Sequence, residues 1–182
     1  MDFAARRFAE NGYHPTSVAE IVQGMGVGKG VFYWYFDSKE ELLGEILREA
    51  QLDLRRRQQQ FIEAETDPDP LRRIELGIRA TMQWIHDNRH LSILFQFAST
   101  EERFAPVIRR GREVTIDDVA RHIKEGIVEG RIRDIDPTVL AHAILGATNH
   151  LARVLLIELH DPPDAVADAA VAFCLGGLAS RT

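Results

Sequence analysis

The chain has 182 residues, of which 45% are hydrophobic, and it carries a formal net charge of −6 at pH 7. This composition is ample for a hydrophobic core, and the length fits one compact domain or a small domain joined to a larger one. A single cysteine, Cys174, excludes an intrachain disulfide, and its apolar neighbours indicate a small buried side chain. The sequence shows no secretory segment and no apolar run near the ~18 residues of a membrane span, so we expect a cytoplasmic protein without membrane contact.

The segment from Val18 to Leu43 predicts two short helices joined by a glycine-rich turn. Thr16 and Ser17 can cap the first helix, whose apolar residues recur at helical spacing until Gly24 ends it. The next residues, Met25 to Gly28, are too few for a strand and allow a sharp reversal before a second helix. This pattern is typical of a helix-turn-helix that reads DNA.

The second helix, Lys29 to about Phe36, contains a continuous aromatic run whose side chains must point in several directions. Phe32 and Phe36 are four residues apart and suit the core side. The outer side is then formed by Gly30, Val31, Tyr33 and Trp34. Tyrosine hydroxyls and the indole N–H can bond phosphate oxygens, and flat rings can pack on sugars or thymine methyl groups. The alternative is that these rings only pack inward.

A third helix is predicted to begin after Ser38, because Ser38 and Glu41 have the spacing of a capping box. Lys39 lies in the first turn of that helix. A lysine beside the free amides of a helix start is a natural phosphate contact.

Five segments of this region resemble the amino-terminal domain of TetR-type transcriptional regulators: Phe8–Tyr13, Thr16–Ile21, Gly26–Gly30, Tyr33–Phe36 and Ser38–Leu43. The resemblance implies an all-α homodimer with a three-helix DNA-binding head and a larger helical body that holds an inducer pocket. It places the head at residues 1–45 and the ligand-binding and dimerisation body at residues 46–182.

Carried over by position, the resemblance implies nine DNA-contacting residues: Thr16, Ser17, Lys29, Gly30, Val31, Tyr33, Trp34, Tyr35 and Lys39. The sequence departs from the family pattern at Gly28, where a serine or threonine cap is common. The given residues also include almost no basic arm before the first helix, so they do not predict the phosphate anchoring that such an arm supplies in the family.

A phosphate-binding loop is an alternative interpretation of the glycine-rich part of the head. The glycines around Lys29 suggest such a loop, but the spacing is one residue short, Gly30 replaces the metal-binding hydroxyl and no apolar strand precedes it.

The head carries no net positive charge, whereas proteins that bind DNA are usually basic. We therefore expect weak non-specific binding, with affinity that depends on dimerisation and base contacts.

The rest of the chain shows helical patterns without strand alternation. The expected helices are residues 39–65, 71–87, 91–98, 105–129, 136–159 and 164–178. The last two are rich in small residues that allow close helix approach, so we expect them to form the homodimer interface. Their small residues are Ala141, Ala143, Gly146, Ala147, Ala169, Ala170, Ala172, Gly176 and Gly177, and their larger apolar residues are Leu140, Ile144, Leu151, Val154, Leu155 and Phe173. The alternative is that both helices pack only within the chain.

An inducer pocket should combine aromatic and apolar side chains with a few polar groups. The candidates are Phe61, Met82, Trp84, Ile85, Leu94, Phe95, Phe97, His122, His142, Asn149 and Arg153. For each polar candidate, a role within the core or interface is the alternative. The apolar and aromatic candidates favour a hydrophobic or aromatic ligand.

His86 and His90 have a spacing that could share a metal ion, but no third ligand is evident, so we expect neither a metal nor another cofactor. No nucleophile, base and orienting group are grouped as in an enzyme. The favoured function is a homodimeric repressor that binds a palindromic operator through Lys29–Phe36 and is released by a small molecule. A helical dimeric adaptor that does not bind DNA is the alternative.

Overall fold

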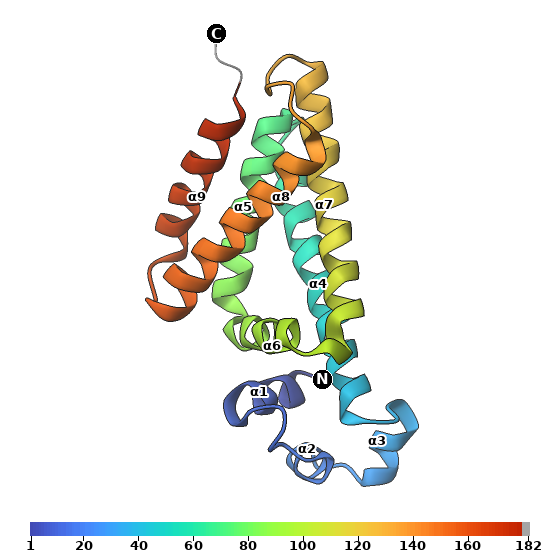
Figure 1. Ribbon diagram of the computed structural model, residues 1–182. Coiled ribbons are helices and arrows are strands. Elements are labelled where there is room, and N and C mark those ends of the chain that lie inside the picture. The colour runs from blue at the N-terminus through green and yellow to red at the C-terminus, as the bar shows by residue number, and fades with distance from the viewer. Residues whose placement is uncertain (180–182) are drawn as a thin grey trace. The chain divides into compact units, whose positions relative to one another are not determined.

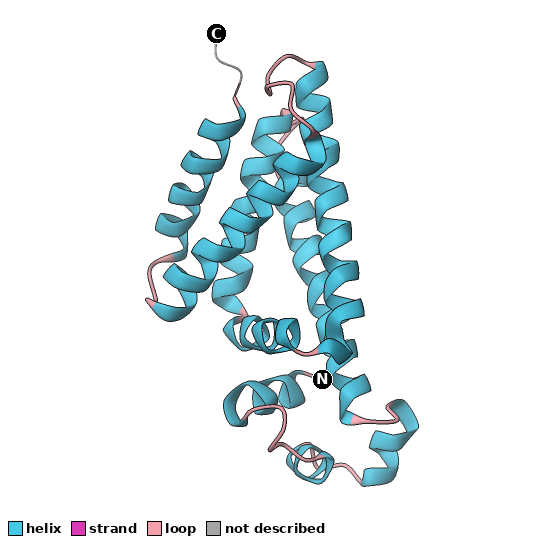
Figure 2. Ribbon diagram, viewed as in Figure 1, coloured by secondary structure: helices cyan, strands magenta, loops and turns pink. Residues whose placement is uncertain are grey.

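The computed structural model describes residues 1–179, and these fold into helices joined by short loops (Figure 2). Within this described part no β-strand is formed, apart from an isolated bridge between Ile132 and Ala179. The prediction of an all-α protein is therefore confirmed. The helices form two compact units: unit 1 contains residues 1–52 and 88–111, and unit 2 contains residues 53–87 and 112–182.

Unit 1 contains the predicted helix-turn-helix (Figure 1). Its elements are α1 (Asp2–Asn11), α2 (Val18–Gly24), α3 (Lys29–Tyr35), the first part of α4 (Lys39–Glu63), α6 (Arg89–Thr100), the short 3₁₀-helix η1 (Glu102–Phe104) and the first residues of α7 (Ala105–Val128). The structure thus confirms helices at both positions that the turn chemistry of the sequence indicates.

Local capping explains where α2 and α4 begin. The Ser17 hydroxyl accepts a hydrogen bond of 3.1 Å from the Glu20 amide, which satisfies one free donor of α2. The Ser38 hydroxyl accepts 3.1 Å from the Glu41 amide, and the Glu41 carboxylate accepts 2.6 Å from the Asp37 amide. The predicted cap at Ser17 and the predicted box at Ser38 are confirmed.

Two glycines shape the end of α2 for different reasons. Gly26 has a φ of +67°, a left-handed conformation that suits glycine and turns the chain toward α3. Gly24 is the last residue of α2, and a Cβ there would lie 2.1 Å from the Phe3 ring of α1. Gly24 therefore permits α1 and α2 to pack closely, while Gly26 makes the reversal.

The core of unit 1 is assembled from distant parts of the chain. Apolar side chains of α1, α2, α3 and α4 pack together with Leu94 and Ala98 of α6 and Phe104 of η1. Helix α1 lies against α6. The three-helix head is thus completed by residues 88–111, although residues 53–87 between the two parts belong to unit 2.

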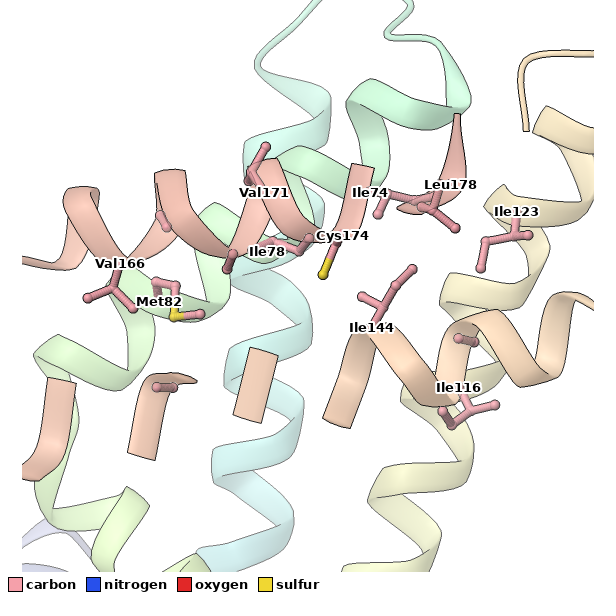
Figure 3. Close-up of a cluster of buried hydrophobic side chains, with 14 of the residues drawn as sticks. Ile74, Ile78, Met82, Ile116, Ile123, Ile144, Val166, Val171, Cys174 and Leu178 are labelled. Carbon is pink, nitrogen blue, oxygen red and sulfur yellow. The ribbon is translucent and has the colours of Figure 1, made fainter. Parts of the chain in front are cut away.

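Unit 2 is built from the remaining parts of α4 and α7 together with α5 (Pro70–Asp87), α8 (Pro137–Leu151) and α9 (Pro163–Leu178). Helix α9 packs along α5. Their side chains contribute to one apolar core, to which Ile78 and Met82 of α5 and Val166, Val171 and Cys174 of α9 all belong (Figure 3). Cys174 is buried, as predicted, and burial raises the pKa of its thiol.

The expected helix over residues 136–159 changes its winding after Leu151. Residues Ala152–Glu158 form a π-helix, in which Arg153 pairs with Glu158 at 2.5 Å across five positions. Within the combined stretch Pro137–Glu158, an 18-residue window has a mean hydropathy of 1.3 and is 28% buried, so by length and composition alone the stretch could cross a membrane. The core helix of a soluble protein passes the same test, so this is weak evidence for a membrane span.

Candidate DNA-binding site

Helix α3 exposes most of its aromatic side chains. Trp34 is 85% exposed, Tyr35 70%, Tyr33 55% and Val31 48%, whereas Phe32 is 6% exposed and belongs to the core. Phe36 is half-buried and packs on Phe32 with ring centroids 5.7 Å apart. The predicted division of this helix into a core side and an outer side is confirmed. Phe32 anchors α3 to unit 1 and leaves the other rings facing solvent.

Packing within the chain does not explain the two glycines beside this surface. A Cβ at Gly28 or Gly30 would meet no atom within 4 Å. Neither residue has the left-handed φ seen at Gly26. Gly28 precedes α3, and no side chain caps that helix start. The fold itself therefore does not require glycine at either position, and both glycines leave the backbone open on the outer surface.

Thr16 stands at the start of α2 but faces inward. Its side chain is fully buried and its hydroxyl donates to the Gly12 carbonyl at 2.8 Å. This bond fixes the turn between α1 and α2. Thr16 therefore has a structural role, and Ser17 has one as the cap of α2.

Lys39 joins the start of α4 to the turn between α1 and α2. Its ammonium group donates to the carbonyl oxygens of Tyr13 at 2.9 Å, His14 at 3.0 Å and Thr16 at 3.1 Å. It also lies 4.5 Å from the centroid of the Tyr13 ring. An ammonium has three N–H donors, so all of them are used within the protein. The sequence indicated a phosphate contact for Lys39, but in this structure the residue holds the helix-turn-helix together.

Tyr13 forms the centre of an aromatic and ionic cluster that sequence reasoning missed. Its buried ring lies 5.2 Å from the Phe97 ring and 5.7 Å from the Phe104 ring. Burial, reinforced by the negative charge of Glu40, raises the pKa of Tyr13 to about 12, so the phenol is neutral at ordinary pH. Arg103 pairs with Glu40 of α4 and ties this cluster to η1. Its members are far apart in the sequence, which hides the cluster from pattern analysis.

The surface around α2 and α3 has little positive charge. Lys29 is the only lysine or arginine between His14 and Ser38, and it is exposed at the start of α3. The carboxylate of Glu20 in α2 accepts a hydrogen bond of 3.1 Å from the Asn11 side-chain amide and lies 4.0 Å from the Arg7 guanidinium. The outer surface of α3 is therefore mainly aromatic, with Lys29 as the only cation of the helix.

The proposed ligand residues fall into three groups in the structure. Leu94 is buried in the core of unit 1, and Phe95 and Phe97 pack against that core. His142, Asn149 and Arg153 are exposed along α8 and η2. The remaining candidates lie buried or half-buried in unit 2: Phe61, Met82, Trp84, Ile85 and His122. The sequence prediction of one common pocket thus combined residues with different surroundings, because helical spacing does not show which unit a helix face joins.

Polar contacts accompany the candidates that remain in unit 2. The Trp84 indole N–H donates to the Asp53 carboxylate at 2.7 Å. The buried Nδ1 of His122 makes no hydrogen bond, and burial lowers the pKa of this imidazole. Among residues 1–179, no group of three or more His, Cys, Asp or Glu side chains could hold a metal ion.

We expect replacement of Lys39 by methionine to destabilise the protein, because three carbonyl oxygens would lose a charged donor. The expected loss is about 1–3 kcal/mol, measured by denaturant unfolding followed by circular dichroism. Lys29→Met is the matched control, since it removes an exposed lysine and should change stability by less than about 0.5 kcal/mol. Equal stability of the two variants would show that the Lys39 bonds do not support the fold.

Comparison with known proteins agrees with this geometry. Residues 1–46 match the family described as bacterial regulatory proteins, tetR family, and residues 67–178 match the tetracyclin repressor-like C-terminal domain. The HTH-type transcriptional regulator YdgC of Bacillus subtilis is 25% identical over 91% of this chain and 84% of its own length.

Two solved structures show the same fold. The ketosteroid transcriptional regulator KstR2 of Mycobacterium tuberculosis has 25% identity and a TM-score of 0.74, covering 99% of this chain and 93% of its own. A bacterial regulatory protein of the tetR family from Rhodococcus RHA1 has 22% identity and a TM-score of 0.81, covering 100% of this chain and 95% of its own. The exposed helix-turn-helix, both domain matches and these relatives lead to one conclusion: the chain belongs to the TetR family of DNA-binding transcriptional regulators.

Proposed function

We propose that the protein is a homodimeric repressor that binds a palindromic operator through α3 and is released by a small hydrophobic or aromatic molecule. The observation that carries this proposal is the outer surface of α3, where Tyr33, Trp34 and Tyr35 face solvent although Phe32 beside them is buried. Large exposed aromatic side chains on a second helix-turn-helix element are suited to enter the major groove. We therefore assign the cytoplasm as the compartment, where the DNA of a bacterium lies.

The roles of the DNA-contacting residues follow from their positions. Lys29 is the charged phosphate contact, and the tyrosine hydroxyls of α3 are neutral phosphate donors. Gly30 and Val31 lie where the helix backbone approaches the bases. Thr16, Ser17 and Lys39 act by positioning α2 and α3, since their side chains are engaged in internal hydrogen bonds. Repression is the simplest outcome, because a protein bound at a promoter excludes other proteins from it.

Dimerisation through α8 and α9 is supported by an exposed apolar surface. Phe173 is 71% exposed and Val139 59%, and Leu159, which follows η2, is also exposed. A Cβ at Gly146, Gly176 or Gly177 would meet no atom within 4 Å, so packing within the chain does not require glycine at these positions. Ala141, Ile144 and Ala170 belong instead to the core of unit 2. A second copy that covers the exposed residues would present two α3 helices to two half-sites.

For the inducer we retain the buried and half-buried candidates of unit 2: Phe61, Met82, Trp84, Ile85 and His122. Their apolar character supports a hydrophobic ligand, and so does the description of the relative KstR2 as a ketosteroid transcriptional regulator. Helices α4 and α7 each contribute residues to both units. We propose that ligand binding changes the equilibrium between two arrangements of these helices, which requires different ligand affinities for the two states.

Selection of bound duplexes from a random DNA pool tests the function directly. The purified protein should enrich a palindrome whose half-sites are separated by about one helical turn of DNA, roughly 34 Å. A folded protein that enriches no sequence would contradict the proposed operator.

Replacement of Gly30 by alanine should move stability and DNA affinity in opposite directions. Alanine favours a helix by up to about 1 kcal/mol over glycine, and the structure has room for its Cβ. The added methyl group would, however, hold the backbone away from the groove and weaken operator binding roughly tenfold, or about 1.4 kcal/mol. Thermal unfolding and fluorescence anisotropy with the selected operator measure the two effects.

Gly77→Ala is the matched control, because Gly77 lies in α5 and a Cβ there also meets no atom within 4 Å. This variant should keep full DNA affinity. If Gly30→Ala also binds normally, α3 does not approach DNA through this position.

Phe173→Asp should convert the dimer to a monomer without unfolding it, because the side chain is exposed in the single chain and would place a charge in the proposed interface. Sedimentation or light scattering gives the mass. Val128→Asp is the control: Val128 is 82% exposed on α7, outside α8 and α9. A Phe173→Asp protein that stays dimeric would place the interface elsewhere.

A further inference from the structure

The outer surface of α3 has few groups that can read a purine by hydrogen bonding. The helix sequence is KGVFYWY, so after Lys29 it contains no arginine, lysine, asparagine, glutamine, serine or threonine. These are the side chains that form the usual specific pairs with guanine and adenine in the major groove. With Lys29 assigned to a phosphate, the rest of α3 must use another feature of the base pairs.

The exposed residues of α3 match one such feature, the C5-methyl group of thymine. This methyl is the apolar group that a base pair presents in the major groove, and apolar side chains contact it. Val31 is 48% exposed and has only methyl groups at its tip. The rings of Tyr33 and Trp34 add apolar area beside it, and the absence of a side chain at Gly30 lets this part of the helix approach the bases.

The charge of the surface leads to the same inference. Lys29 is the only lysine or arginine between His14 and Ser38, and Lys39 is occupied by three carbonyl oxygens. Electrostatic attraction to phosphates is therefore small on this surface. Burial of apolar area is the favourable term that the exposed side chains can supply.

We propose that the protein reads its operator half-sites through thymine methyl groups, with Val31 as a specificity-determining residue supported by the Tyr33 and Trp34 rings. This inference rests on the proposed function, since it specifies the DNA that α3 recognises. Val31 is the most diagnostic member, because its side chain has no polar group that could bond a phosphate instead.

The test uses the selected operator with single thymines replaced by deoxyuridine, which keeps every base-pair hydrogen bond and removes only the methyl group. At one or two positions of each half-site, the substitution should weaken binding roughly three- to fivefold for each methyl group lost. Replacement of guanine by 7-deazaguanine, which removes the N7 acceptor, is the matched control and should have little effect at positions facing α3.

The protein variant Val31→Ala completes a double-mutant cycle. It should bind the thymine operator more weakly and should no longer distinguish thymine from deoxyuridine at the position that Val31 contacts. The substitution is on an exposed side chain, and circular dichroism will verify that the helix content is unchanged. Placing 5-methylcytosine at that position should retain more affinity than placing unmethylated cytosine.

The possible outcomes separate this inference from the proposed function. If the random pool yields no operator, both are overturned. If an operator is found but thymine and deoxyuridine versions bind equally, the protein is an operator-binding regulator that does not read methyl groups. Strong loss with 7-deazaguanine alone would show that α3 reads guanine edges instead.

Discussion

The ammonium group of Lys39 is the contact on which the helix-turn-helix depends. It donates to three carbonyl oxygens, at Tyr13, His14 and Thr16, and so joins the first residue of α4 to the turn that leads into α2. Hydrogen bonds to charged groups are among the stronger ones in proteins. Because α3 lies between α2 and α4 in the chain, fixing the start of α4 against the start of α2 restricts the position of α3. The buried Phe32 then sets which side of α3 faces outward.

This construction has a consequence for recognition. A cation that in principle could contact a phosphate is used to hold the fold, and the surface that remains is aromatic and apolar, with Lys29 as the only cation of α3. Gly28 and Gly30 add open backbone that the fold itself does not require. A regulator with such a surface gains affinity from shape, apolar contact and dimerisation more than from charge. The negative net charge of the chain is consistent with this balance.

Local features of the fold were predictable from the sequence, and long-range ones were not. The Ser17 and Ser38 caps, the glycine turn and the inward direction of Phe32 depend on neighbouring residues, and the structure confirms them. The Lys39 partners lie 23 to 26 residues away, and Phe97 reaches Tyr13 across more than eighty positions, so periodicity alone could not reveal either contact. For the same reason, the spacing of Leu94, Phe95 and Phe97 did not show that they pack in or against the core of unit 1. The π-helix after Leu151 likewise has no signal in the spacing of apolar residues.

The salt dependence of operator binding tests the central claim most directly, namely that α3 recognises DNA with little help from charge. The slope of log affinity against log salt concentration reports how many phosphates are neutralised, at about 0.9 per contact. With Lys29 as the one exposed lysine of α3 in each chain of the proposed dimer, we predict a slope of about −2. A slope of about −6 or steeper would contradict the account, because it would require several further cations of each protomer to contact phosphates.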